Sequence, residues 1–352
     1  MVEKLMQPEM KLVLELSTYP TKLTKVDILN LSEDKIIKLL VANQVMLPFL
    51  KNLNHFSNSE LSSIKNKIHT LMKKDYVLDP DKKIPLALSI LDDLNVEYMM
   101  HKHLFYEREQ GDLDILVPVE KFDYVINELK KRGFTPTSHE SHKIGMTKFD
   151  DDSKFTIHIH AKIKWESEFV STNDVWIRSR QIKICEKVVR IPSVEDSILI
   201  ECAHAFFEAR LVRLCDLLQF LELLKHETID WQKVISRFIE YRYQAAGYLY
   251  LLAMDHLIKK FYKKSPIPTE ILNKLEQNIS QADKFLAVNY AKKKILSNTH
   301  LSAPLKISLA SSAILFISYN ERFGVTKFLW SISVVFAALI RYIEVKLGLR
   351  KL

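Results

Sequence analysis

The segment 111–117, which reads Gly-Asp-Leu-Asp-Ile-Leu-Val, constrains this chain more than any other part of it. Its apolar run is typical of a short buried β-strand, on which side chains alternate between the two faces. Asp112 and Asp114 are therefore expected side by side on one face. Two neighbouring carboxylates repel each other unless a cation lies between them, so the pattern favours a hard divalent ion such as Mg²⁺. Solvated acids at a strand end give the same pattern, and the flanking segments must decide between the two interpretations.

The segments that flank this strand predict an α+β unit. Upstream, residues 84–94 have the apolar spacing of a helix, and residues 96–100 read as a short strand. Downstream, residues 119–132 form an amphipathic helical pattern that stops at Gly133. Residues 143–164 then predict a β-hairpin whose turn holds three consecutive aspartates. The predicted order is a helix, a strand, the Asp-x-Asp strand, a helix and a hairpin. This order resembles the layout of a nucleotidyltransferase core.

On these residues the chain resembles the uncharacterised, nucleotidyltransferase-like branch of the DNA polymerase beta-type nucleotidyltransferase superfamily. In that branch a strand ending in Lys-Gly is followed by an Arg and then by Gly-Asp-x-Asp with apolar neighbours. The matching positions here are Lys102, Arg108, Gly111, Asp112 and Asp114, with His103 where the family has Gly. A later family strand, acid-hydrophobic-His, is similar to residues 158–160, and the family's helical tail is similar to residues 192–220. The resemblance covers about residues 35–225.

The resemblance implies an enzyme that transfers a nucleoside monophosphate from a nucleoside triphosphate to a hydroxyl-bearing acceptor. Asp112 and Asp114 would hold one or two Mg²⁺ or Mn²⁺ ions on the triphosphate, with ATP as the expected donor. Residues assigned to the nucleotide are Lys102, Arg108, Gly111 and His160, the last with a supporting role beside the metal as an alternative. A small molecule, a protein side chain and an RNA end all stay open as the acceptor, and a partner protein stays open as well.

One departure from the family affects the predicted chemistry. The superfamily has three carboxylates at its site, and the third position here is His158. A neutral imidazole there favours Zn²⁺ or Mn²⁺ over Mg²⁺, and it could still act as a general base. Alternatively, an acid of residues 150–152 reaches into the site, or the protein is a degenerate, non-catalytic member that binds nucleotide or a partner. A metal-dependent phosphohydrolase is a further alternative, although the usual His-Asp pair spacing is absent.

The composition limits how the chain can bind a nucleotide and in which cellular compartment it is expected. With only 6 glycines the chain holds neither a P-loop nor a dinucleotide fingerprint, so a nucleotide must be held by metal and basic side chains. The three cysteines lack metal-type pair spacing and no signal peptide is evident, which favours a cytoplasmic setting. The net charge of +8 comes from scattered short lysine clusters. Solvated helix faces, a nucleic-acid surface and a membrane surface are the three interpretations of these clusters.

The predicted fold class is α+β, a small mixed β-sheet nucleotidyltransferase core flanked by N-terminal and C-terminal helical modules. We divide the chain into a helical module at 1–80, the core at 81–191 and a C-terminal helical domain at 192–352. Ser193 and Asp196 form a capping-box pattern that opens a helix running to about residue 209. Further helices are expected at residues 211–224, 245–261 and 271–285.

Two apolar runs near the C-terminal end, residues 307–318 and 328–340, fall short of the roughly 20 residues of a membrane span. No transmembrane span is therefore predicted. Packed helices, a hairpin that makes peripheral contact with a membrane, and an oligomer interface are the alternatives for these runs. The oligomeric state stays open.

Overall fold

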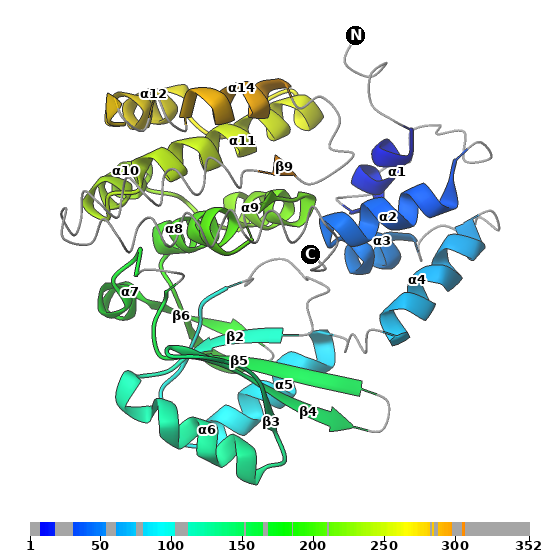
Figure 1. Cartoon of the computed structure of the whole chain (residues 1–352), viewed down its shortest axis with the longest axis vertical. Helices are drawn as coiled ribbons and strands as arrows, with labels where there is room; N and C mark the ends of the chain where they lie inside the picture. The colour runs from blue at the N-terminus through cyan, green and yellow to red at the C-terminus, as the bar shows by residue number, and fades with distance from the viewer. Residues whose placement is uncertain are drawn as a thin grey trace, which may run out of the picture.

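Helices cover both faces of one mixed β-sheet in the computed structural model of the protein (Figure 1). The structure describes residues 8–17, 31–53, 61–74, 80–102, 112–150, 153–164, 168–184, 186–209, 211–281, 284, 288–297 and 305–306. The predicted runs 307–318 and 328–340 lie outside these residues, as does the turn at residues 151–152.

The sheet has seven strands in the order β3-β4-β5-β2-β1-β7-β6. The strands are β1 (Met99–Met100), β2 (Asp112–Leu116), β3 (Thr135–Glu140), β4 (Lys143–Asp150), β5 (Ser153–His160), β6 (Arg180–Ile184) and β7 (Lys187–Ile191). Strand β2 pairs parallel with β5 and antiparallel with β1, and β1 pairs parallel with β7. The hairpins β3-β4, β4-β5 and β6-β7 are antiparallel. The motif strand β2 therefore lies near the middle of the sheet.

One face of the sheet is covered by α5 (Pro80–Asp93) and by α6 (Phe122–Lys131), which follows the short 3₁₀ helix η4 (Val119–Lys121) (Figure 1). The amphipathic pattern of α6 is realised, since its apolar residues Val125, Ile126 and Leu129 are buried in the core below the sheet. Gly133 ends this segment with φ +85°, a left-handed conformation that glycine adopts without strain.

The other face is covered by the C-terminal helices, which stack in layers above the sheet (Figure 1). They are α8 (Val194–Ala203), the π-helix η5 (His204–Ala209), α9 (Leu214–His226), α10 (Trp231–Glu240), α11 (Gln244–Tyr262), α12 (Thr269–Gln277) and α14 (Asn289–Ser297). The short helix α7 (Thr172–Arg178) precedes β6. As predicted, Ser193 caps α8, because its hydroxyl accepts a hydrogen bond from the backbone N–H of Asp196 at 3.2 Å.

The N-terminal helices α1 (Pro8–Ser17), α2 (Glu33–Asn43), α3 (Met46–Leu53) and α4 (Ser62–Lys74) pack beside this stack (Figure 1). Their apolar side chains belong to the same continuous core as those of α8 to α11. The side-chain oxygen of Asn43 accepts a hydrogen bond from the backbone N–H of Leu214, at the start of α9, at 3.1 Å. The N-terminal and C-terminal helices thus share one core, and the proposed domain boundaries stay a prediction.

The α+β class, the mixed sheet and its flanking helices are confirmed. Several elements differ from the sequence prediction, and α7 and β6 were not predicted at all. The helix expected from residue 211 begins at Leu214, because Leu211–Val212 forms strand β8, which pairs with β9 (Leu305–Lys306). The helix expected to reach residue 285 ends at Gln277. Strand β3 was not predicted, because all six of its residues are exposed and show no apolar alternation.

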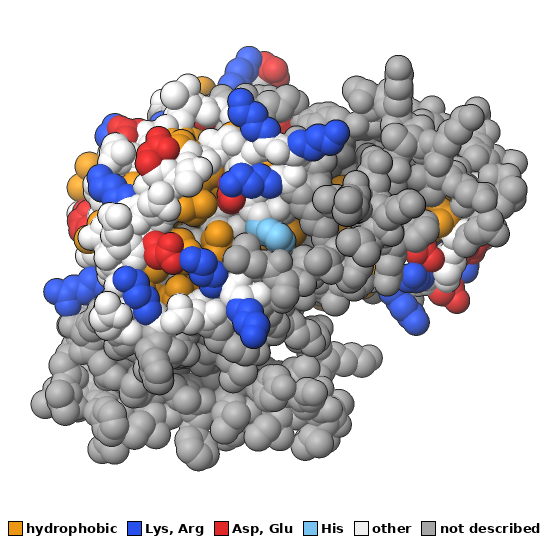
Figure 2. Space-filling view, turned by 90° about the horizontal axis from the view of Figure 1, so that it is seen from above, with side chains coloured by type: hydrophobic (Ala, Val, Ile, Leu, Met, Phe, Trp, Pro, Cys, Tyr) orange, Lys and Arg blue, Asp and Glu red, His pale blue; other side chains and the backbone are white. Residues whose placement is uncertain are grey.

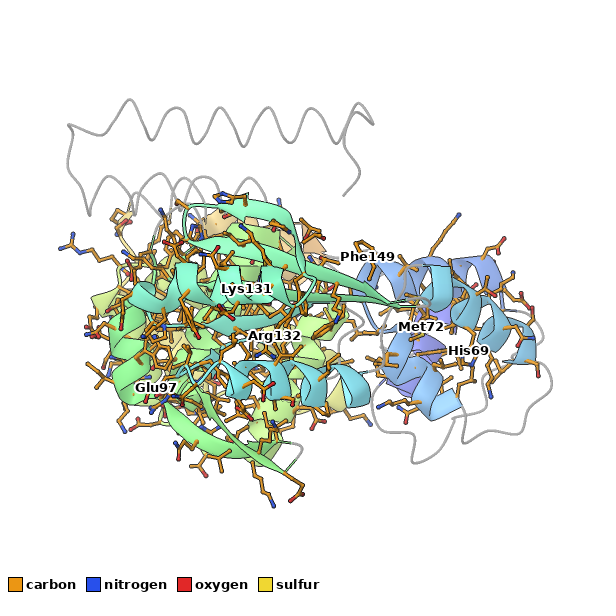
Figure 3. The ribbon with its side chains drawn as sticks, turned by 90° about the horizontal axis from the view of Figure 1, so that it is seen from below. His69, Met72, Glu97, Lys131, Arg132 and Phe149 are labelled. Carbon is orange, nitrogen blue, oxygen red and sulfur yellow. The ribbon has the colours of Figure 1, made fainter. Side chains whose placement is uncertain are left out.

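The surface views locate the charged and exposed apolar side chains. On the outer face of the C-terminal helices, the described Lys and Arg side chains are interspersed with acidic and apolar ones (Figure 2). On the opposite side, Lys131 and Arg132 lie at the end of α6, and Phe149 lies at the far end of the β4-β5 hairpin, toward the side that carries α4 (Figure 3). In Figure 2 the described Lys and Arg side chains do not gather into one patch. Within the described residues, no helix has the length and apolar character needed to cross a membrane.

Candidate active site

Asp114 lies at the centre of a buried polar cluster, on the face of the sheet that the C-terminal helices cover. The side chains of Leu113 and Ile115 on β2, and of Val117 just after it, pack into the core with those of α5 and α6. Alternation therefore directs Asp114 to the opposite face, toward the C-terminal helices, where only 5% of its side chain is exposed. A carboxylate buried so deeply needs cations or hydrogen-bond donors around it. The residues described below supply both.

Two histidines of β5 face Asp114 because β2 and β5 pair in parallel. The register places Asp114 opposite His158 and Leu116 opposite His160. The Nε2 atom of His160 lies 2.7 Å from Asp114 Oδ1, a hydrogen-bond distance, whereas His158 Nδ1 lies 3.7 Å from the same oxygen. Gly145 of β4 makes room for the His158 ring, because a Cβ atom there would lie 3.0 Å from His158 Cδ2.

Lys102, just after β1, joins Asp114 to a second carboxylate. Its ammonium nitrogen lies 3.5 Å from Asp114 Oδ1 and donates a hydrogen bond to Glu208 Oε2 at 3.1 Å. Glu208 comes from the π-helix η5 and also accepts from Lys143 Nζ of β4 at 3.1 Å. His204, one turn earlier on η5, places Nδ1 2.6 Å from Glu208 Oε2. Ion pairs from Lys102 and Lys143 to Glu208 therefore connect the sheet to η5 across this site.

The surroundings shift the pKa values of three of these groups. Burial alone would raise the pKa of Asp114, but the Lys102 charge and the two β5 histidines beside it hold this pKa well below its usual range. Burial lowers the pKa of His160 to about 4, although Asp114 opposes this shift. Burial would likewise raise the pKa of Glu208, but the charges of Lys102 and His204 hold it well below its usual value. At neutral pH both carboxylates are ionised and His160 is neutral.

Three buried side chains could hold a metal ion. Among the described residues, one ligand atom from each of His101, Asp114 and His160 lies within 4.8 Å of the other two. The rings of His101 and His160 meet edge to face, with centroids 4.4 Å apart. Two imidazole nitrogens and one carboxylate oxygen suit Mn²⁺ or Zn²⁺ better than Mg²⁺, which prefers oxygen ligands. The donor set therefore fits a divalent transition metal once the Asp114-His160 hydrogen bond opens.

The structure brings together four of the predicted site residues: Asp114, His158, His160 and Lys102. Asp112 begins β2 on the same strand face as Asp114, but its side chain lies outside the described part of the structure. Arg108 and Gly111 lie outside the described residues. The assignment of these residues to metal and nucleotide stays a prediction.

Four residues of the cluster had no assigned role in the sequence: His101, Lys143, His204 and Glu208. His101 could have been found from its position beside Lys102 and its place in the same strand alternation as Met99. Lys143 opens the predicted hairpin and pairs with His160 in the register of β4 and β5. Glu208 carries no local signal, because only the packing of η5 against the sheet brings it to Lys102.

Comparison with known families found a match in the central region of the chain. Residues 104–259 match the model of a family described as "uncharacterised nucleotidyltransferase". This match confirms the nucleotidyltransferase-like resemblance predicted from the sequence and includes β2, β5 and η5. It begins two positions after Lys102 and covers somewhat less than half of the chain.

One solved structure is similar over part of the chain. It is the crystal structure of the lincosamide antibiotic adenylyltransferase LnuA with lincomycin bound. The alignment covers 42% of this chain and 97% of that one, at 15% sequence identity and a TM-score of 0.33, a likeness too low to support conclusions about substrate. Among curated proteins no relative matches the chain.

Proposed function

We propose that this protein is a metal-dependent nucleotidyltransferase that transfers a nucleoside monophosphate from a nucleoside triphosphate to a hydroxyl-bearing acceptor. The observation that carries the proposal is the ionised, buried Asp114 on the Asp-x-Asp strand, inside the segment that matches the nucleotidyltransferase family. ATP as the donor and a cytoplasmic location belong to the proposal. The acceptor stays open among a small molecule, a protein and RNA.

The proposed roles follow from charge and position. Asp112 and Asp114 would hold the divalent ion, which when bound supplies the positive charge that offsets the triphosphate. Lys102 and Arg108 would bind phosphate oxygens, and Arg can do so with two parallel hydrogen bonds. His158, on the register position opposite Asp114, would lie beside the attacking hydroxyl and accept its proton.

Label transfer tests this function directly. The protein is incubated with each α-³²P nucleoside triphosphate and Mg²⁺ or Mn²⁺ in fractionated lysate, alongside the Asp112→Asn variant. We expect labelled product from the parent protein and none from Asp112→Asn, because the amide removes a charged metal ligand. The labelled fraction would identify the acceptor class. Equal transfer by parent and variant would remove Asp112 from the site.

Metal binding distinguishes two ligand sets that share Asp114. If His101 and His160 are ligands, His101→Ala and His160→Ala should each weaken Mn²⁺ or Zn²⁺ binding on the order of 10- to 100-fold, as measured by equilibrium dialysis. His158→Ala is the matched control, since its ring lies farther from Asp114 Oδ1, and we expect little change. The reverse result, with loss confined to His158→Ala, would instead support the set predicted from the sequence. Thermal melting of each variant shows that it is folded.

A second candidate function is nucleotide or partner binding without catalysis. One observation favours it: the Lys102 ammonium, 3.5 Å from Asp114 Oδ1, already supplies positive charge at the carboxylate. The third-acid position held by His158 points the same way. This candidate predicts saturable binding of a nucleoside triphosphate with no release of pyrophosphate. Pyrophosphate release that requires the parent protein, and that Asp112→Asn does not produce in the same lysate fraction, would exclude it.

A further inference from the structure

The carboxylate of Glu208 is surrounded by three basic side chains from separate parts of the chain. Lys102 Nζ and Lys143 Nζ each donate to it at 3.1 Å, one to each oxygen. His204 Nδ1 lies 2.6 Å from Oε2. The two lysines belong to the sheet, whereas the carboxylate and the histidine belong to η5 above it. Such a convergence of donors on two oxygens is the arrangement that a phosphate group requires.

Solvent reaches the carboxylate more readily than the lysines that hold it. The side chain of Glu208 is 31% exposed, compared with 12% for Lys143 and 2% for Lys102. An anion that arrives from solvent therefore meets Glu208 first, on the outer side of the cluster. Swinging this one side chain outward would present both ammonium groups to the incoming anion. The π-helical turn that carries Glu208 is a local irregularity of a kind often found at functional sites.

Among the described lysines and carboxylates of the cluster, the charges balance while Glu208 stays in place. Lys102 and Lys143 carry two positive charges, and Asp114 and Glu208 carry two negative ones. Withdrawing Glu208 takes one negative charge away from the buried ammonium group of Lys102, which is unfavourable unless another anion replaces it. A phosphate of a nucleotide carries at least as much negative charge and accepts the same hydrogen bonds.

We propose that Lys102, Lys143 and His204 form the polyphosphate subsite of the nucleotide, and that Glu208 occupies this subsite until a phosphate group displaces it. The proposal rests on the proposed function and deepens it, since it assigns the triphosphate to particular residues. Glu208 acts as an internal competitor of the substrate. Lys102 remains paired with Asp114 when the carboxylate leaves, so the phosphate is brought next to the proposed metal ligand.

Inorganic tripolyphosphate is the probe, because it has neither a base nor a transferable nucleoside monophosphate. Its affinity is measured by isothermal titration calorimetry on the full chain. Glu208→Gln should bind it on the order of tenfold more tightly than the parent, because the competing charge is gone while the side-chain size is kept. Lys143→Gln should bind it on the order of tenfold more weakly. Glu270→Gln, at an exposed acid in the first turn of α12, is the matched control and should leave the affinity unchanged.

Unchanged or weaker binding by a folded Glu208→Gln protein would overturn the proposal, as would the absence of tripolyphosphate binding in both parent and variant. Should Glu208→Gln fail to fold, Lys143→Gln decides, and unchanged affinity in that variant would also overturn it. The assay separates this inference from the proposed enzyme activity. If the variants bind tripolyphosphate with the expected affinities but the protein shows no nucleotidyl transfer, the subsite is supported and the enzyme activity is not. If the protein transfers nucleotide but the affinities do not change as expected, the subsite is refuted and the enzyme activity stands.

Discussion

Replacing Asp114 with Asn is expected to reduce nucleotidyl transfer by roughly 10²- to 10³-fold or more, the size of effect seen when a group that stabilises developing charge is lost. The amide keeps the shape of the side chain but removes the negative charge that Lys102 and a bound metal ion would share. The side-chain amide also has an NH₂ group where the carboxylate has a second oxygen. This NH₂ group can only donate hydrogen bonds, whereas the His160 ring and the Lys102 ammonium group need an acceptor. The rate of label transfer from the α-³²P nucleotide under single-turnover conditions measures the loss.

Asp123→Asn is the matched control for this substitution. Asp123 lies in the first turn of α6, on the other side of the sheet. Its substitution is the same chemical change as Asp114→Asn, at a position outside the cluster. We expect its transfer rate to equal that of the parent. An Asp114→Asn protein that is folded, by circular dichroism and thermal melting, and that keeps more than a small fraction of the parent rate would show that this carboxylate is not the metal-holding group.

The largest effect on stability is expected at Asp196, whose side chain is fully buried in the first turn of α8. Arg178 binds both of its carboxylate oxygens at 3.0 Å, and Arg237 Nη1 lies 3.0 Å from Oδ1. The Ser193 hydroxyl donates to Oδ2 at 2.9 Å. Asp196→Ala removes the shared anion and leaves two guanidinium groups facing each other, which should lower the free energy of unfolding by about 3–5 kcal/mol. Urea denaturation measures this loss.

Asp93→Ala is the control for a broken surface pair. Asp93 pairs with Arg132 at 3.1 Å, with most of its side chain in water, so its loss should cost at most about 1 kcal/mol. A similarly small cost for Asp196→Ala would mean that the arginines find new partners. Asp174 and Glu195, which already lie 3.9 Å and 3.7 Å from them, are the nearest candidates.

Side-chain alternation accounts for what the sequence could predict about the site. The Asp-x-Asp pattern correctly implied that Asp114 lies on a strand face opposite the apolar side chains of β2. The same alternation places His158 and His160 on one face of β5. Their distances to Asp114 depend on the parallel register of β2 and β5. That register was not readable from either strand alone, because about 40 residues of helix and hairpin separate them.

Long-range packing accounts for what the sequence could not predict. Glu208 is 106 positions from Lys102 and meets it only because η5 lies on the sheet. Strand β3 escaped prediction because an edge strand that buries nothing has no apolar periodicity, and Pro136 further weakens its pattern. The start of α9 was misplaced because two apolar residues, Leu211 and Val212, fit the pattern of a helix as well as that of a strand. Their pairing with the distant segment β9 makes them a strand.

The bond between Asn43 and Leu214 joins residues 171 positions apart, and Arg213 beside it donates to the side chain of Gln44 at 2.6 Å. These contacts anchor the beginning of α9, only a few residues after the segment that carries Glu208 and His204. The N-terminal helices therefore support the segment η5, which carries two residues of the charged cluster. The smallest piece of this protein able to keep its site intact is consequently longer than the 104–259 region shared with the family: it needs Lys102 on one side and α2 as a distant support.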